Sequence, residues 1–96
     1  MMTAAQARTA TVDRLAVMAK EFIINYTGIA IQNAIDKGKF VTTVPFDGKM
    51  PSEANTEALG KEVVSQLKEQ GFEAEHVYYD GPNGYDNYIL IKWGED

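Results

Sequence analysis

His76 is the only histidine of this 96-residue chain, and its side chain is the best suited to acid–base chemistry or metal binding near neutral pH. The chain offers it few partners, because it contains no cysteine and no second histidine for a zinc site. Glu73 and Glu75 are close in sequence, but adjacent residues of a strand point to opposite faces. We therefore predict that His76 is a strand residue at the sheet surface, without a catalytic or metal-binding role.

A second group of polar side chains lies in the segment DGPNGYDN, at residues 80–87. Asp80, Asn83 and Asp86 offer oxygen atoms of the kind that bind calcium. The spacing is not that of an EF-hand, and the closing glutamate is missing. A tight hairpin loop needs the same residue types without any ion, so the segment fits either a calcium site or a plain turn. The glycines of the chain form neither a GxGxxG motif nor a phosphate-binding loop, so nucleotide binding by those motifs has no support.

The composition restricts the class of protein. Hydrophobic residues make up 45% of the chain, which is typical of a globular domain, and we predict a single domain over residues 1–96. The formal charge of −5 argues against binding a nucleic-acid backbone, which needs clustered lysine and arginine. No apolar run approaches the ~18 residues of a membrane span, and residues 1–12 do not resemble a secretion signal. Serine and threonine lack the base and orienting acid of a nucleophilic site, so we predict no enzymatic activity and no cofactor.

The longest regular pattern is a helix predicted over residues 10–37, a stretch without proline. We expect residues 1–9, which are small and polar, to be frayed, and Thr9 or Thr11 to cap the helix. Two apolar stripes run along it, about 200° apart at roughly 100° per residue. The first stripe consists of Leu15, Phe22 and Ile29, and the second consists of Val17, Ile24 and Ile31. A helix that rests on one small sheet needs a single apolar face, so the second stripe predicts contact with another chain.

Thr27 and Gly28 interrupt the helical pattern. Glycine costs about 1 kcal/mol relative to alanine inside a helix, so its presence predicts a kink or a close contact. A kink would rotate the second half of the helix and turn Ile31 and Ile35 toward the protein's own core. Val17 and Ile24 precede the glycine, so a kink would leave their direction unchanged.

The remaining elements are predicted to be strand, helix, strand and strand. Residues 40–46 alternate as in a strand, with Pro45 at its end or on a sheet edge. A helix follows over residues 52–70, with Ser52 as its cap and Gly71 just past its end, where Phe72 folds back on the helix. Residues 47–51 form the turn before it. Strands over residues 72–80 and 85–93 form a hairpin around Gly-Pro-Asn-Gly.

These elements predict an α+β fold, a two-layer sandwich of the order α-β-α-β-β with a three-stranded mixed sheet in the order 2-3-1. The helix-facing core should consist of Ile89, Ile91 and Trp93 from the last strand and Leu59, Val63 and Leu67 from the second helix. Tyr88 and Leu90 alternate with these strand residues and point to the other side of the sheet. Tyrosine is common both at interfaces and in strands, so this side fits an interface or a plain sheet surface.

The assembled pattern resembles a type of small protein encoded by tailed bacteriophages. The matching pieces are a first helix ending in AIDKGKF, a strand, a helix closing in LKEQGFEAE, and a final strand written YILIKW. The resemblance covers residues 30–93 and contains no catalytic signature, so no site residue is transferred. It implies a virion component or an accessory factor acting on the host, located in the host cytoplasm or in the virion.

We predict that the protein forms a homo-oligomer through its first helix. The predicted interface residues are Val17, Ile24, Ile31, Tyr88 and Leu90. The alternative is an inhibitor that binds a basic host protein through its carboxylates, at Glu53, Glu57, Glu62, Glu69, Glu73, Glu75 and Asp80. A third hypothesis is a pocket between chains that binds a small ligand. Salt separates the first two, because apolar association survives high salt whereas acidic capture of a basic partner weakens.

Overall fold

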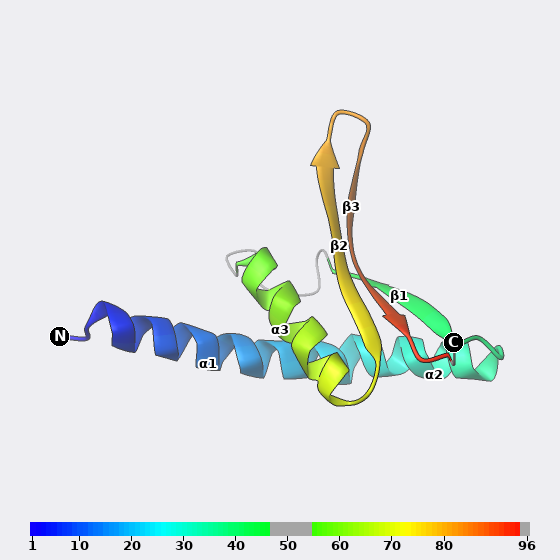
Figure 1. Cartoon of the computed structure of the whole chain (residues 1–96), viewed down its shortest axis with the longest axis horizontal. Helices are drawn as coiled ribbons and strands as arrows, with labels where there is room; N and C mark the ends of the chain where they lie inside the picture. Colours follow the sequence, from blue (N-terminus) through cyan, green and yellow to red (C-terminus); the bar gives the residue numbers. More distant parts are fainter. Residues whose placement is uncertain (47–54, 95–96) are drawn as a thin grey trace.

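The computed structural model describes residues 1–46 and 55–94 of the chain. The elements in order are α1 (Ala4–Phe22), the π-helical segment η1 (Ile23–Thr27), α2 (Gly28–Asp36), β1 (Val41–Pro45), α3 (Thr56–Glu69), β2 (Glu73–Gly81) and β3 (Gly84–Lys92). The predicted α+β fold is confirmed. One long helix made of α1, η1 and α2 crosses the molecule, and the β2–β3 hairpin projects away from it (Figure 1).

The long helix begins earlier than predicted. The Thr3 hydroxyl accepts a hydrogen bond from the Gln6 amide at 3.1 Å, and the Gln6 side-chain oxygen accepts one from the Thr3 amide at 2.9 Å. This reciprocal pair is a capping box, which satisfies amides that the first turn would otherwise leave without partners. The prediction of Thr9 or Thr11 as the cap is wrong, since both lie inside α1, where the Thr11 hydroxyl donates to the Ala7 carbonyl.

A π-helical segment interrupts the long helix where a kink at glycine was predicted. The Gly28 amide donates to the carbonyl of Ile23, five residues back, while Gly28 itself has ordinary helical angles (φ −58°, ψ −41°). The additional residue in this turn rotates the helix that follows relative to the helix before it. Ile29, predicted to face the sheet, is therefore 59% exposed, whereas Ala34 is buried and Ile31 packs against the edge of the core.

Gly28→Ala should raise the free energy of unfolding by up to about 1 kcal/mol, because alanine has the higher helix propensity by about that amount. A Cβ atom at this position would lie 3.5 Å from the Ile23 carbonyl oxygen, which is an ordinary contact. Urea denaturation followed by circular dichroism measures the change. A loss of stability would contradict this prediction and show that the π-helical turn requires glycine.

The long helix and α3 are each followed by a glycine, which was predicted for α3 at Gly71. Gly38 and Gly71 have positive φ angles of 73° and 92°. At the end of α3 the Gly71 amide donates to the Lys68 carbonyl at 3.0 Å, and the Phe72 amide donates to the Leu67 carbonyl at 3.1 Å. This pattern is a Schellman motif, and it leads the chain from α3 directly into β2.

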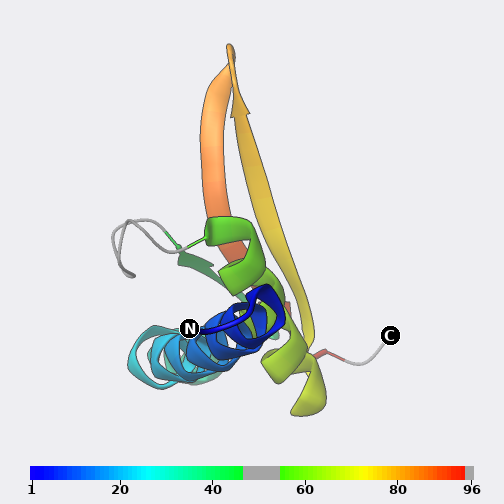
Figure 2. The same cartoon turned by 90° about the vertical axis from the view of Figure 1, so that its left-hand side faces the viewer.

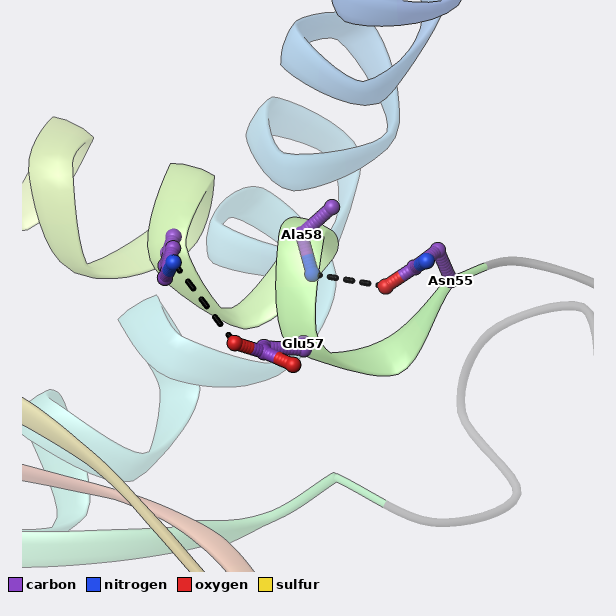
Figure 3. A network of polar contacts seen from close by, with 4 residues as sticks. Asn55, Glu57 and Ala58 are labelled. Carbon is purple, nitrogen blue, oxygen red and sulfur yellow. Dashed lines mark hydrogen bonds and ion pairs between the residues drawn. The ribbon is translucent and has the colours of Figure 1, made fainter.

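The N-terminus of α3 is capped by Asn55, whose side-chain oxygen accepts a hydrogen bond from the Ala58 amide at 2.9 Å (Figure 3). Figure 3 also shows Glu57, which forms an exposed ion pair with Lys61 at 3.6 Å. Such a pair contributes little to stability. The predicted cap Ser52 and the predicted turn at 47–51 lie outside the described residues.

The sheet has the order β1-β3-β2, as predicted. The strand β3 is antiparallel to both neighbours, so β1 and β2 point the same way without being adjacent. The hydrogen-bonded sheet is thus antiparallel and not mixed. Val44 of β1 and His76 of β2 both pair with Ile89 of β3, which places these three side chains on the same side of the sheet.

The core lies between this side of the sheet and the helices. Its fully buried members include Phe22 of α1, Leu59, Val63 and Leu67 of α3, and Ile89 and Ile91 of β3. The predicted core is confirmed, with Trp93 at its edge, where its ring packs edge-on against Phe72 at 6.1 Å. On the other side of the sheet, Val41 and Tyr79 are exposed.

Candidate interaction surface

A groove of about 830 Å³ runs between the long helix and α3. Val17 and Ile24 line it from the long helix, and they remain 47% and 63% exposed. Leu67 and Phe72 contribute to the opposite wall. The predicted seam therefore lies in a concave surface, which the helical periodicity did not reveal because α3 supplies the second wall. We call this surface the helix groove.

The two walls of the helix groove are held together by Gln66 of α3. Its side-chain nitrogen donates to the Ala16 carbonyl of α1 at 2.9 Å and to a Glu62 carboxylate oxygen at 3.3 Å. The groove is therefore formed within a single chain. Lys20, Glu62 and Glu69 surround its apolar floor with charge, and an apolar centre with a polar rim is the usual anatomy of a protein interface.

The three predicted seam residues differ in their surroundings. Val17 and Ile24 precede the end of η1 and lie in the open part of the groove, whereas Ile31 follows it and is half-buried against the core. Ile35 is exposed, so the inward turn considered for Ile31 and Ile35 occurs only at Ile31. The extra residue in η1 explains the difference, because it rotates α2 about the helix axis.

Tyr88 and Leu90 lie on the side of the sheet that faces away from the helices. Both are half-buried, because neighbouring strands flank β3 on each side. Their cross-strand neighbours are Pro45 and Val77 for Tyr88, and Thr43 and Glu75 for Leu90. The structure does not bring Tyr88 and Leu90 to the helix groove, so they belong to a second surface.

His76 is a strand residue, as predicted, and it lies half-buried on the helix-facing side of β2. Its Nε2 atom lies 2.7 Å from the Asn87 side-chain oxygen, and its ring packs against Phe46 at 5.1 Å. A Cβ atom on Gly60 of α3 would come within 2.2 Å of the His76 Nδ1 atom. Gly60 therefore lets α3 approach the imidazole. Sequence reasoning missed Gly60, although a glycine inside a helical pattern is a signal of close approach.

The carboxylates of the segment at residues 80–87, which was considered as a calcium site or a plain turn, do not converge. Asp80 of β2 pairs with Tyr85 of β3. Asp86 of β3 pairs with Tyr79, the residue that precedes Asp80 in β2. Alternation along the strands directs the two carboxylates to opposite faces of the hairpin. Within residues 1–46 and 55–94, no three histidine, aspartate or glutamate side chains come close enough to hold a metal ion.

The carboxylates proposed for an acidic docking surface are distributed over two sides of the molecule. Glu62 and Glu69 border the helix groove, whereas Glu73 and Glu75 share the open side of the sheet. Glu53 lies outside the described residues. This distribution favours no single acidic surface.

Comparisons with protein-family models, with curated proteins and with solved structures find no match. In the described part of the chain, none of the helices combines the length and apolar character that crossing a membrane requires. The relation to bacteriophage proteins stays a prediction, and the functional proposal depends on the geometry of the surfaces.

Proposed function

We propose that this protein is a non-enzymatic building block that self-associates through the helix groove. The supporting observation is the exposure of Val17 and Ile24, at 47% and 63%, on the long-helix wall of a preformed groove. Each large apolar side chain gains about 1.5–3 kcal/mol when it is removed from water, which favours covering this wall. Val17 and Ile24 both precede the end of η1, and their seven-residue spacing suits a neighbouring helix, so a second copy of the long helix is the proposed occupant.

Within this proposal the protein acts as a virion component or an assembly factor of a bacteriophage, in the virion or the host cytoplasm, with a host or virion protein as a further partner. The surroundings of His76 support a role without catalysis. One imidazole nitrogen is engaged by Asn87, and the other faces the backbone of α3 at Gly60. His76, the side chain best suited to acid–base chemistry, thus serves the packing of α3 on the sheet.

Ile24→Glu should lower the molar mass of the assembly in solution, because burying a carboxylate in the apolar groove without a partner is costly. Ile29→Glu is the matched control. Ile29 lies on the same helix and is 59% exposed, close to the 63% of Ile24, but it does not line the helix groove. Size-exclusion chromatography with light scattering at ~100 μM, well above the micromolar constants of weak complexes, measures both variants and the parent.

We expect the control to keep the mass of the parent, and the association to persist at high salt, since it depends on apolar contacts. If the unmodified protein is monomeric at this concentration, the proposal is wrong. An equal effect of both variants would contradict it too, because a general charge effect would then explain the change. Circular dichroism should show the same helical signal in all three proteins.

A further inference from the structure

A further candidate surface, distinct from the helix groove and from the side of the sheet that carries Tyr88 and Leu90, is an edge of the sheet. The strand β2 has nine residues and is hydrogen-bonded to β3 along one edge, while its other edge pairs with none of the described strands. The opposite edge strand, β1, has only five residues and includes Pro45. Short length and proline protect an edge against pairing, whereas a long strand without proline is open to it. The edge of β2 is therefore the accessible one.

The register shows which backbone groups face this edge. The Phe46 amide donates to the Asn87 carbonyl, and the Trp93 amide donates to the Phe40 carbonyl, each at 3.0 Å. Odd-numbered residues of β3 thus bond toward β1, and even-numbered ones bond toward odd-numbered partners in β2. The residues of β2 that direct their amides and carbonyls to the open edge are Ala74, His76, Tyr78 and Asp80.

The outer half of the hairpin stands clear of the helices (Figure 2). Tyr78 and Tyr85 lie there on the helix-facing side, and both are exposed. Their rings contact each other edge-on at 6.0 Å. Thr56, Glu57 and Lys61 of α3 line a pocket with Tyr78, so the first turns of α3 reach this residue, but both tyrosines stay exposed.

We propose that two copies of this protein pair β2 with β2, antiparallel, about a two-fold axis at Val77. Val77 is the central residue of Glu73–Gly81, so this register uses the whole strand. Even-numbered residues face even-numbered residues, which joins their open amides and carbonyls across the axis. In this register His76 faces Tyr78, Ala74 faces Asp80, Glu75 faces Tyr79, and Val77 faces its own copy. No carboxylate lies directly opposite another, so the strand is self-complementary.

The same register offers one contact between opposite charges. A groove of about 780 Å³ follows the edge between β2 and α3, and its charged lining residues are Lys61, Lys68, Glu69 and Glu75. The proposed register brings Asp80 of the second copy opposite Ala74, on the helix-facing side where Lys68 lies. The two-fold axis repeats this contact. Because the strands are antiparallel, each α3 lies beside the outer half of the other hairpin, and the two helices are offset along the strands.

The edge of β2 and the helix groove are different surfaces, so this inference does not rest on the proposed function. Together they would let each copy contact two others, and the assembly would extend beyond a dimer. The edge pairing by itself yields a closed dimer.

The absence of cysteine from the chain allows a direct test with single-cysteine variants. In the proposed pair the two Val77 residues are opposite each other at a non-hydrogen-bonded position, with Cα atoms about 4.5 Å apart. This separation lies within the range of about 4.4–6.8 Å that disulfides span. Val77→Cys should therefore form a reducible covalent dimer in most of the protein when oxidised glutathione is added at micromolar protein concentration.

Tyr79→Cys is the matched control, because Tyr79 lies on the same strand and the same side of the sheet. Two copies of residue 79 would be about 13 Å apart along the strands at ~3.4 Å per residue, too far for a disulfide. The Tyr79→Cys variant alone should stay monomeric on a non-reducing gel. A mixture of the Glu75→Cys and Tyr79→Cys variants should give a mixed disulfide, since these residues face each other in the proposed register.

Equal cross-linking by Val77→Cys and Tyr79→Cys would overturn the edge pairing, and so would a mixture of Glu75→Cys and Tyr79→Cys that stays uncoupled. Repeating Val77→Cys together with Ile24→Glu separates the two surfaces. We expect the covalent dimer to form there as well, because the helix groove is not needed for it. A cross-link that forms while Ile24→Glu leaves the mass of the assembly unchanged would support the edge and reject the helix groove.

Discussion

Ile91→Ala should lower the free energy of unfolding by about 2–5 kcal/mol, the range observed when a large side chain is removed from a core. Ile91 is fully buried, lies in the central strand, and is flanked by Thr42 and Ala74 on the neighbouring strands. Neither neighbour is large enough to fill the space left by the missing atoms. A small domain has about 5–15 kcal/mol of stability in total, so this loss is a large share of it.

Leu90→Ala is the control for this measurement. Leu90 is the preceding residue of the same strand, but it is half-buried on the open side of the sheet. Leu90→Ala should lower the free energy of unfolding by clearly less than Ile91→Ala, because part of the Leu90 side chain is already in water. Urea unfolding of both variants, at a concentration where the parent and the variants have the same oligomeric state, gives the comparison. An Ile91→Ala variant that unfolds like the parent would show that the core assignment is wrong.

Gly60→Ala should lower the free energy of unfolding by about 1–3 kcal/mol, the usual cost of overpacking. The new Cβ would lie within 2.2 Å of Nδ1 and 2.8 Å of Cγ of His76, so the whole imidazole must move. Movement would break the 2.7 Å contact between His76 and Asn87. The gain in helix propensity, about 1 kcal/mol, offsets only part of this cost.

Gly28→Ala is the natural comparison, since both glycines lie in helices and the substitution is the same. The two changes should have opposite signs, because a Cβ on Gly28 meets only an ordinary contact at 3.5 Å. Adding His76→Ala to Gly60→Ala tests whether the clash with the imidazole causes the loss of stability. The double variant should be more stable than the sum of the two single effects predicts, by about 0.5–3 kcal/mol, as for residues in direct contact. Strict additivity would show that His76 is not the obstacle.

The order of the elements could be predicted because their signals are local. Gly38 and Gly71 end helices through positive φ angles that other residues adopt only with strain. The alternation of Ile89 and Ile91 with Tyr88 and Leu90 assigned the two sides of β3, and the register confirms it. The strand order followed from placing the most apolar strand in the centre.

The candidate surfaces could be predicted only in part. The spacing of Val17 and Ile24 indicated an exposed apolar stripe, and both residues are exposed. The second wall of the helix groove comes from α3, more than thirty residues away in the chain, through the contact of Gln66 with Ala16. No periodicity within the helix carries information about such a distant partner. The open edge of β2 likewise depends on which strand became central.

The sequence by itself determined the order of the elements, the glycine that ends α3 and the side of the sheet that is apolar, because these depend on backbone sterics and on side-chain alternation. Only the tertiary structure decided the direction of Ile29 and Ile31. The π-helical turn before Gly28 inserts one residue into the helical repeat, and the packing of both helix halves against the rest of the fold selects it. The tertiary structure also decided the place of His76, since the pairing of β2 with β3 turned it toward Asn87 and α3 approaches its ring closely at Gly60.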